Sequence, residues 1–155
     1  MEIRMDGRVA LITGGSKGLG YAMGLKFAES GAKIALAART EAEVKQAALS
    51  IIQTTGQKAI GYVCDVANAD DIKQLHQAVT TDFERIDILV NNAGFAKAGA
   101  FESITDDEWQ YDLDLKLMAA VRLSRLVLPS MKANRWGRII NMLNTLAKTP
   151  AKGSA

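Results

Sequence analysis

A glycine-rich segment near the start of the chain has the residue types and spacing of a phosphate-binding loop. It reads Thr13-Gly14-Gly15-Ser16-Lys17-Gly18-Leu19-Gly20 and follows a short apolar run that predicts a β-strand. A helix is predicted directly after it, and a helix N-terminus offers unpaired N–H groups and a partial positive charge. Glycines there let the backbone approach a pyrophosphate closely. The segment predicts an anion site, although glycines that only turn the chain would have the same spacing.

Two further polar motifs follow predicted strands, and a third leads into the last strand. Asp65-Val66 comes after the third apolar run and Asn91-Asn92-Ala93-Gly94 after the fourth, while Gly137-Arg138-Ile139-Ile140-Asn141 enters the fifth. Open α/β sheets bind their ligands outside the carboxyl ends of the strands. We therefore expect the first two motifs to lie beside the glycine-rich loop.

Apolar, β-rich runs alternate along the chain with longer segments of helical period. Strands are predicted at Val9–Thr13, Lys33–Ala38, Lys58–Cys64, Ile86–Asn91 and Arg138–Met142, and helices at Leu19–Ser30, Glu41–Thr55, Ala69–Glu84 and Asp106–Ala133. Capping signals are Thr40 with Glu43, Thr105 with Glu108, and Asn68. Parallel strands need crossover helices, so the alternation predicts an α/β, doubly wound parallel sheet of about five strands in a three-layer α/β/α arrangement.

The composition fits a single domain covering residues 1–155. The sequence has 19 Lys and Arg against 17 Asp and Glu, a net charge of +2, with no block of like charges. Neither nucleic acid nor an anionic membrane is an expected partner. The apolar runs are far shorter than the ~20 residues of a membrane span. The start lacks the apolar stretch of a secretory signal and Cys64 is the single cysteine, so we expect a cytoplasmic protein. No metal site is predicted.

Together these four motifs resemble the short-chain dehydrogenase/reductase family in order and spacing, in the manner of 3-oxoacyl-carrier-protein reductases. The resemblance runs from about Asp6 to Met142. It implies a Rossmann-type domain and NAD(P)-dependent chemistry on a small-molecule carbonyl or alcohol, with 3-oxoacyl compounds as one candidate class. For the full-length protein it implies a homo-oligomer.

The resemblance also implies roles for individual residues of a cofactor site. In the family Asp65 accepts a hydrogen bond from the adenine amino group, Val66 packs on adenine, and Asn91, Ala93 and Gly94 line the ribose and nicotinamide side. Asp65 as a turn residue and Asn91 as a strand-end stabiliser are compatible interpretations. The predicted cofactor-binding residues are Thr13, Gly14, Ser16, Lys17, Gly18, Leu19, Gly20, Arg39, Asp65, Val66, Asn91, Ala93 and Gly94.

The end of the second predicted strand favours NADP(H) over NAD(H). An NAD-specific site carries Asp or Glu there, about twenty residues past the glycines, to accept the ribose 2′-OH. This chain has Ala37-Ala38-Arg39 instead. Arg39 can pair with a 2′-phosphate as a planar donor, and Lys17 adds a second charge. The opposing interpretation is that both are ordinary solvated cations.

The catalytic positions of the family are only partly present. The resemblance implies a Tyr with a Lys four residues on, a Ser that orients the substrate oxygen, and a helix Asn. Counting from Trp109, Lys116 stands at the Asn position, and counting from Gly137, Asn144 stands at the Ser position. Thr145 offers a hydroxyl one residue along, but neighbouring residues in extended chain point to opposite sides. The Tyr and Lys would lie beyond the end of the sequence, so we expect this chain alone to be inactive.

Family members continue with further strands, so the resemblance implies that residues 1–155 form an incomplete dinucleotide-binding domain that lacks the last strands. The fifth predicted strand should then be an exposed edge. The remaining titratable residues that could do chemistry are expected to serve packing or the surface: Tyr21, Tyr62, Tyr111 and His76.

Two function classes therefore stay open. The intact cofactor motifs favour part of an NADP(H)-dependent oxidoreductase, whereas Lys116 and Asn144 favour an NADP-binding protein without dehydrogenase activity. A Rossmann-like methyltransferase is a third and weaker alternative, because its second strand is usually followed by an acidic ribose ligand and Arg39 lies there instead.

Overall fold

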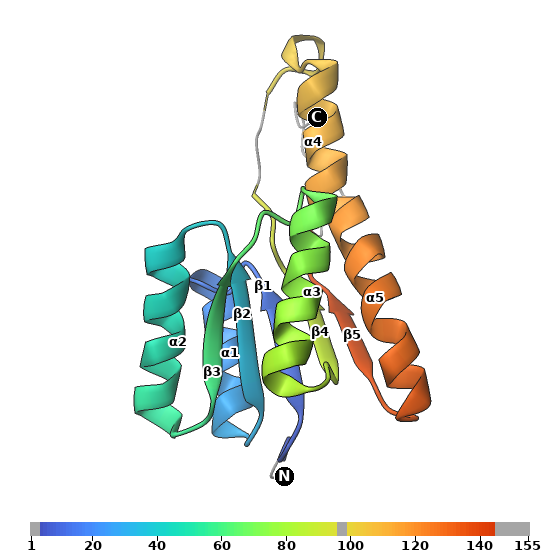
Figure 1. The fold of residues 1–155 in the computed structure, drawn as a ribbon. Coiled ribbons are helices and arrows are strands. Elements are labelled where there is room, and N and C mark those ends of the chain that lie inside the picture. The colour runs from blue at the N-terminus through green and yellow to red at the C-terminus, as the bar shows by residue number, and fades with distance from the viewer. Residues whose placement is uncertain (1–3, 96–98, 145–155) are drawn as a thin grey trace.

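One parallel sheet, covered by helices on both faces, forms the centre of the chain in a computed structural model that describes residues 4–95 and 99–144 (Figure 1). The strands are β1 (Val9–Thr13), β2 (Lys33–Ala38), β3 (Ala59–Val63), β4 (Ile88–Asn91) and β5 (Arg138–Asn141). The helices are α1 (Gly18–Glu29), α2 (Glu41–Thr55), α3 (Ala69–Phe83), η1 (Phe101–Ser103), α4 (Asp106–Leu113), η2 (Asp114–Met118) and α5 (Ala119–Ala133). The strand order is β3-β2-β1-β4-β5, and all neighbours are parallel. The predicted α/β, doubly wound architecture is confirmed.

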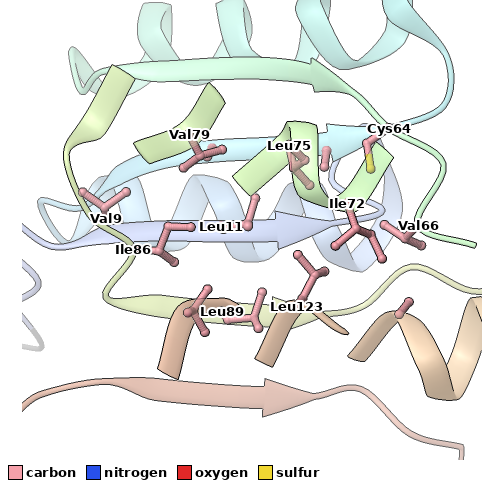
Figure 2. Close-up of a cluster of buried hydrophobic side chains, with 14 of the residues drawn as sticks. Val9, Leu11, Cys64, Val66, Ile72, Leu75, Val79, Ile86, Leu89 and Leu123 are labelled. Atoms are coloured by element: carbon pink, nitrogen blue, oxygen red, sulfur yellow. The ribbon is translucent and has the colours of Figure 1, made fainter. Parts of the chain in front are cut away.

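Alternate residues of the central strands enter two separate hydrophobic cores. Val9 and Leu11 of β1 pack with α3 and α5, as Figure 2 shows for Ile72, Val79 and Leu123. Ala10 and Ile12, on the opposite face of β1, pack with α1 and α2. Successive side chains of a strand point to opposite faces, and a parallel sheet buried on both sides therefore needs the continuous apolar runs that this sequence contains.

Two of the three predicted helix caps form. The side chain of Asn68 accepts hydrogen bonds from the backbone N–H groups that start α3, and Thr105 with Glu108 makes a complete capping box at α4. The predicted capping box of Thr40 and Glu43 is wrong, because Thr40 makes no side-chain cap bond at α2. Glu43 faces the glycine-rich loop instead.

The prediction of a single helix at Asp106–Ala133 is wrong, because this segment is interrupted by a π-helical turn. It consists of α4, the π-helical turn η2 and α5. A π turn inserts one extra residue into the helical repeat and is often found at functional sites. The continuous helical pattern of the sequence carries no mark of this insertion. Lys116 lies within the turn, and Leu115 is its buried residue.

β5 lies at the edge of the sheet in this chain, as predicted. Three of its four residues are exposed, among them Ile140. Among residues 4–95 and 99–144, its backbone pairs with β4 alone.

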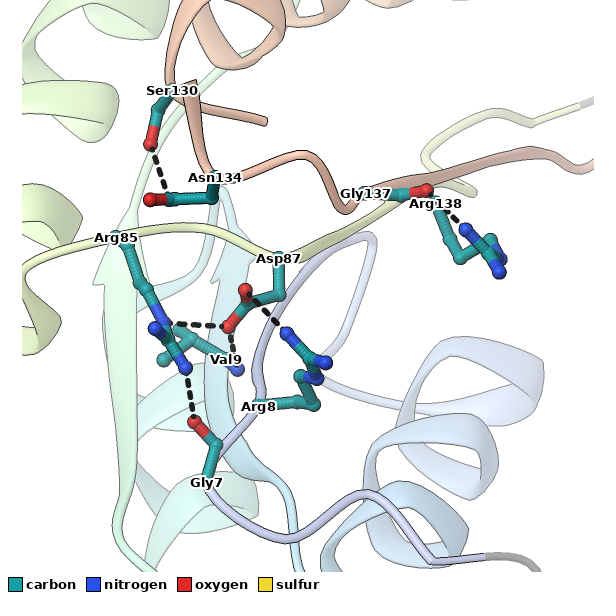
Figure 3. Close-up of polar contacts among 9 residues, drawn as sticks. All are labelled: Gly7, Arg8, Val9, Arg85, Asp87, Ser130, Asn134, Gly137 and Arg138. Carbon is teal, nitrogen blue, oxygen red and sulfur yellow. Dashed lines mark hydrogen bonds and ion pairs between the residues drawn. The ribbon is translucent and has the colours of Figure 1, made fainter. Parts of the chain in front are cut away.

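A buried carboxylate ties the amino-terminal ends of β1 and β4 together. The side chain of Asp87 accepts a hydrogen bond from the backbone N–H of Val9 at 2.9 Å and from Arg85 at 3.0 Å, and Arg8 lies 3.4 Å away (Figure 3). Asp87 is only 1% exposed. Arg85 also donates to the carbonyl of Gly7, so this network fixes the chain segment that enters β1.

We expect Asp87→Ala to lower the free energy of unfolding by about 2–4 kcal/mol, because the buried N–H of Val9 and both guanidinium groups lose their acceptor. Urea denaturation followed by circular dichroism measures the change. The control is Glu29→Ala, which removes an exposed i,i+3 pair with Lys26 and should cost less than about 0.5 kcal/mol. Equal losses in the two variants would contradict the role of Asp87.

His76 on α3 is half-buried, and this burial lowers the pKa of its imidazole from 6.5. The unfolded chain therefore binds a proton that the folded chain does not bind. We expect the free energy of unfolding to fall as the pH drops below about 6.5, and His76→Gln to weaken this pH dependence in urea titrations. Carboxylates with lowered pKa values, such as Asp114, change protonation only at more acidic pH. They contribute equally to the pH dependence of the unmodified chain and of His76→Gln. Parallel pH profiles of the two chains would contradict this prediction.

Candidate functional site

The carboxyl ends of β1 to β4 and the N-terminus of α1 surround an open cavity of about 640 Å³, which we call the strand-end cavity. It lies where the strand order reverses at β1, the place where open α/β sheets bind ligands. Its lining residues are Gly14, Ser16, Lys17, Leu19, Ala37, Ala38, Arg39, Thr40, Glu43, Cys64, Asp65, Val66, Asn92, Ala93, Gly94, Phe95 and Leu115.

Most of the predicted cofactor residues meet at this cavity, although they come from four separate parts of the sequence. Those that line it are Gly14, Ser16, Lys17, Leu19, Arg39, Asp65, Val66, Ala93 and Gly94. The lining does not include Thr13, Gly18, Gly20 or Asn91. Thr13, Gly18 and Gly20 shape the strand end and the loop beside the cavity. Asn91 bonds to β5 instead.

Thr13 and Asn92 join the end of β1 to the end of β4. The Thr13 hydroxyl accepts hydrogen bonds from the backbone N–H groups of Asn92 and Ala93, both at 3.0 Å. The Asn92 side chain donates to the carbonyl oxygens of Thr13 at 3.0 Å and Gly14 at 3.2 Å. The two strand ends and the start of the glycine-rich loop therefore form one hydrogen-bonded unit.

Gly20 allows α1 to pack directly on the glycine-rich loop. A Cβ atom at this position would overlap the carbonyl oxygen of Gly14 and lie 2.7 Å from the Asn92 side-chain nitrogen. Gly14 itself has a φ of +64°, and Gly18 a φ of +58°, which residues with a Cβ rarely adopt. The loop depends on glycine for its backbone path as well as for access to the cavity.

The N-terminus of α1 keeps its positive character, unlike those of α2, α3 and α4. Each of those three helices has acidic residues in its first turn, whereas α1 has none and its N-cap, Lys17, makes no side-chain cap bond. Uncapped N–H groups and the helix dipole favour an anion at this end of the cavity. Both features fit a phosphate group of a dinucleotide.

Charged side chains lie along the rim beside β2. Lys17 and Arg39 are exposed cations, and Glu43 of α2 faces the glycine-rich loop. The Glu43 carboxylate is 3.6 Å from the Lys17 ammonium and accepts a hydrogen bond from Ser16 at 3.4 Å. Lys17 is thus partly neutralised within the chain, whereas none of the ion pairs among the described residues includes Arg39.

The end of β3 forms a less exposed wall of the cavity. Val66 is 5% exposed, and Asp65 accepts a hydrogen bond from the backbone N–H of Ala67 at 3.0 Å, so it does serve as a turn residue. Burial, together with the charges of Asp71 and Asp65, raises the pKa of the Cys64 thiol to about 12. The thiol therefore stays protonated at neutral pH and contributes a small apolar surface.

Asn91, Lys116 and Asn144 are not among the residues that line the strand-end cavity. The Asn91 amide donates to the side chain of Asn141 on β5 at 2.8 Å, which fits a strand-end stabiliser. Lys116 lies in η2 beside Gly94 and forms a 2.7 Å ion pair with Asp112. Asn144 is exposed beyond β5, and Thr145 lies outside the described residues. The catalytic roles of these positions stay predictions.

Several residues of the cavity have no signal in the sequence that marks them for it. Asn92 stands in the Asn91–Gly94 motif, but its bonds to β1 depend on tertiary contact across 79 residues. Phe95, Leu115 and Glu43 line the cavity from three different elements. No local pattern distinguishes them from core or surface residues.

Within residues 4–95 and 99–144, no helix combines the length and apolarity needed to cross a bilayer. The same residues contain no group of three or more His, Cys, Asp or Glu side chains arranged to hold a metal ion.

Known proteins similar to this chain are oxidoreductases. The sequence profile of short chain dehydrogenases matches residues 8–155. The 3-oxoacyl-[acyl-carrier-protein] reductase of Vibrio cholerae is 34% identical over 153 residues, covering 99% of this chain and 61% of that protein. The D-beta-hydroxybutyrate dehydrogenase of Cupriavidus necator is 34% identical over 142 residues, covering 91% and 54%.

Two solved structures are similar in fold. L-sorbose reductase from Gluconobacter frateurii, complexed with NADPH and L-sorbose, gives a TM-score of 0.96 with 36% identity, covering 99% of this chain and 59% of that one. A metagenomic short-chain oxidoreductase in complex with NADP gives 0.91 with 32% identity, covering 97% and 67%. The chain thus spans 61% of the length of the Vibrio reductase and 59% of the length of the sorbose reductase.

We expect Gly20→Ala to disrupt the strand-end cavity, because the added methyl group forces α1 away from the carbonyl of Gly14. The free energy of unfolding should fall by about 1–3 kcal/mol, and any dinucleotide binding should weaken at least about tenfold. Urea denaturation and fluorescence titration measure the two effects. The matched control is Gly24→Ala on the same helix, whose Cβ would meet the ends of the Leu36, Ile51 and Ile12 side chains at 3.2, 3.3 and 3.6 Å. If both variants bound equally well, the close approach at Gly20 would have no importance for the site.

Proposed function

Because the chain belongs to the short-chain dehydrogenase family, we propose that it is the cofactor-binding part of an NADP(H)-dependent oxidoreductase. The proposed substrate is a small-molecule carbonyl or alcohol, with 3-oxoacyl compounds as one class. Relatives named as 3-oxoacyl reductases support this class, and the sorbose reductase complexed with NADPH supports the cofactor.

The observation that carries the proposal is the charge of the strand-end cavity beside β2. Ala37 and Ala38 line it where an NAD-specific site has a carboxylate, and Arg39 follows with its guanidinium outside any ion pair of the described residues. A 2′-phosphate carries close to two negative charges and accepts paired hydrogen bonds from a guanidinium. These residues fit a phosphorylated adenosine ribose.

The remaining residues of the cavity can hold the rest of a dinucleotide. The N–H groups at the start of α1 would hold the pyrophosphate, and Asp65 with Val66 would offer an acceptor and an apolar surface to the adenine ring. Ala93 and Gly94, which line the cavity at the end of β4, would border the nicotinamide ribose. When bound, NADPH would supply the hydride for carbonyl reduction, and these residues would bind and orient it.

A second candidate function is NADP binding without dehydrogenase activity. The observation in its favour is Lys116, which stands at the Asn position of the family and is held in an ion pair with Asp112. Asn144 cannot replace a serine hydroxyl as an equivalent donor. Loss of a catalytic proton donor costs about 10²–10⁴ in rate but leaves ground-state binding nearly intact. Tight NADPH binding by the full-length protein, without turnover of any carbonyl tested, would support this alternative.

We expect the purified chain to bind NADPH with a dissociation constant on the order of micromolar, and NADH at least about tenfold more weakly. Arg39→Ala should weaken NADPH binding about tenfold or more and leave NADH binding within about twofold, because the charged hydrogen bonds to the 2′-phosphate are lost. Nicotinamide fluorescence titrations measure all four values.

The control for this titration is Arg125→Ala, which removes an exposed cation of α5 that lies outside the cavity lining. It should leave both affinities unchanged. Ala38→Asp provides the opposite test, since a carboxylate at the end of β2 should repel NADPH and favour NADH. Equal affinities for the two nucleotides in the unmodified chain, or no effect of Arg39→Ala, would contradict the proposed NADP(H) site.

A further inference from the structure

Three side chains from distant parts of the sequence form a cluster at the rim of the strand-end cavity. We call it the Arg39 cluster: Arg39 follows β2, Phe95 follows β4, and Tyr111 belongs to α4, which extends beyond the carboxyl edge of the sheet (Figure 1). The Arg39 guanidinium donates a hydrogen bond to the Tyr111 hydroxyl at 3.3 Å. It also lies 5.9 Å from the centre of the Phe95 ring, within the range of a cation–π contact.

The two aromatic residues of the cluster also contact each other. The ring centres of Phe95 and Tyr111 are 6.2 Å apart with a tilt of 40°, within the distance at which aromatic pairs attract. Phe95 lines the strand-end cavity, whereas Tyr111 does not. Both line a neighbouring cavity of about 510 Å³ between α4 and the segment before it. Tyr111 therefore acts on the strand-end cavity indirectly, through its contacts with Arg39 and Phe95.

The partners of Arg39 are neutral, which sets it apart from Lys17. Lys17 lies 3.6 Å from the Glu43 carboxylate, so part of its charge is compensated inside the chain. A phenol and a phenyl ring can hold the guanidinium of Arg39 without cancelling its charge. Of these two cations, Arg39 is the one whose charge is not compensated by a carboxylate, so it attracts an added anion more strongly.

Holding Arg39 in place also has an entropic effect. An exposed arginine loses rotamer entropy when it is fixed by a ligand. A side chain that is already held in the binding geometry loses less, and the affinity for the ligand rises accordingly. The Tyr111 hydroxyl accepts only from one nitrogen of the guanidinium, which leaves other N–H groups for a phosphate.

We propose that Tyr111 is a positioning residue that raises selectivity for a 2′-phosphate by holding the guanidinium of Arg39 at the rim of the strand-end cavity. This inference rests on the proposed NADP(H) site and adds a residue of α4 to it. Tyr111 has no catalytic part in it, because its hydroxyl acts on Arg39 and does not line the cavity.

The test is a double-mutant cycle of Tyr111→Phe with Arg39→Ala in the 155-residue chain. Tyr111→Phe keeps the ring against Phe95 and removes only the hydroxyl. We expect it to weaken binding of NADPH and of adenosine 2′,5′-bisphosphate about three- to tenfold, while NADH and AMP stay within about twofold. In the Arg39→Ala background the same change should have no effect, since the two residues act together. Tyr62→Phe is the matched control, because its phenol bonds to Asp82 away from the cavity.

The outcomes separate this inference from the proposed function. If the unmodified chain preferred NADPH and lost this preference in Arg39→Ala, but Tyr111→Phe left the preference unchanged, only the role of Tyr111 would be overturned. Equal weakening of NADPH and NADH by Tyr111→Phe, or an unchanged effect in the Arg39→Ala background, would likewise overturn it in favour of a general structural role. An unmodified chain without preference for NADPH would overturn the proposed NADP(H) site and the role of Tyr111 together.

Discussion

The hydrogen bonds between Thr13 and Asn92 are the contact on which the rest of the site depends. They connect the ends of β1 and β4, which are adjacent in the sheet but distant in the chain. Because the Asn92 side chain also bonds to Gly14, the glycine-rich loop is fixed relative to both strands. α1 can then approach the loop closely at Gly20, and its N-terminus comes to lie at the strand-end cavity. The Asp87 network fixes the opposite ends of the same two strands.

Charge is distributed unevenly around the strand-end cavity. Its α1 end combines the uncapped N-terminus of α1 with Lys17, whose charge is shared with Glu43. Its β2 side has Arg39 among neutral aromatic groups. An exposed cation is ordinarily a weak and unspecific feature of a surface. Two cations on one rim, one compensated and one not, make the rim asymmetric, and this asymmetry supports the proposed binding of the two kinds of phosphate in NADP(H).

The chain has the cofactor motifs of the family but departs from the family at the predicted catalytic positions. Three of the four family motifs contribute residues to the strand-end cavity, and the chain belongs to the short-chain dehydrogenase family. At the catalytic positions, Lys116 is bound to Asp112 in a π turn and Asn144 is exposed beyond the edge strand β5. The chain spans 61% of the length of the Vibrio reductase and 59% of the length of the sorbose reductase.

The sequence by itself determined the order of strands and helices, the glycine-rich loop, and the caps at Asn68 and Thr105. These features depend on local chemistry: apolar periodicity, backbone freedom at glycine, and side chains that bond to an adjacent helix start. Tertiary structure alone decided the rest. Glu43 has the spacing of a capping box but accepts a hydrogen bond from Ser16 across 27 residues, because the fold brings the Ser16 hydroxyl and the Lys17 ammonium within its reach. The π turn has no residue signature, and Tyr111 meets Arg39 across 72 residues only because the sheet brings the ends of β2 and β4 to one edge below α4. Contacts between such distant residues depend on how the elements pack, and no spacing within one segment can specify them.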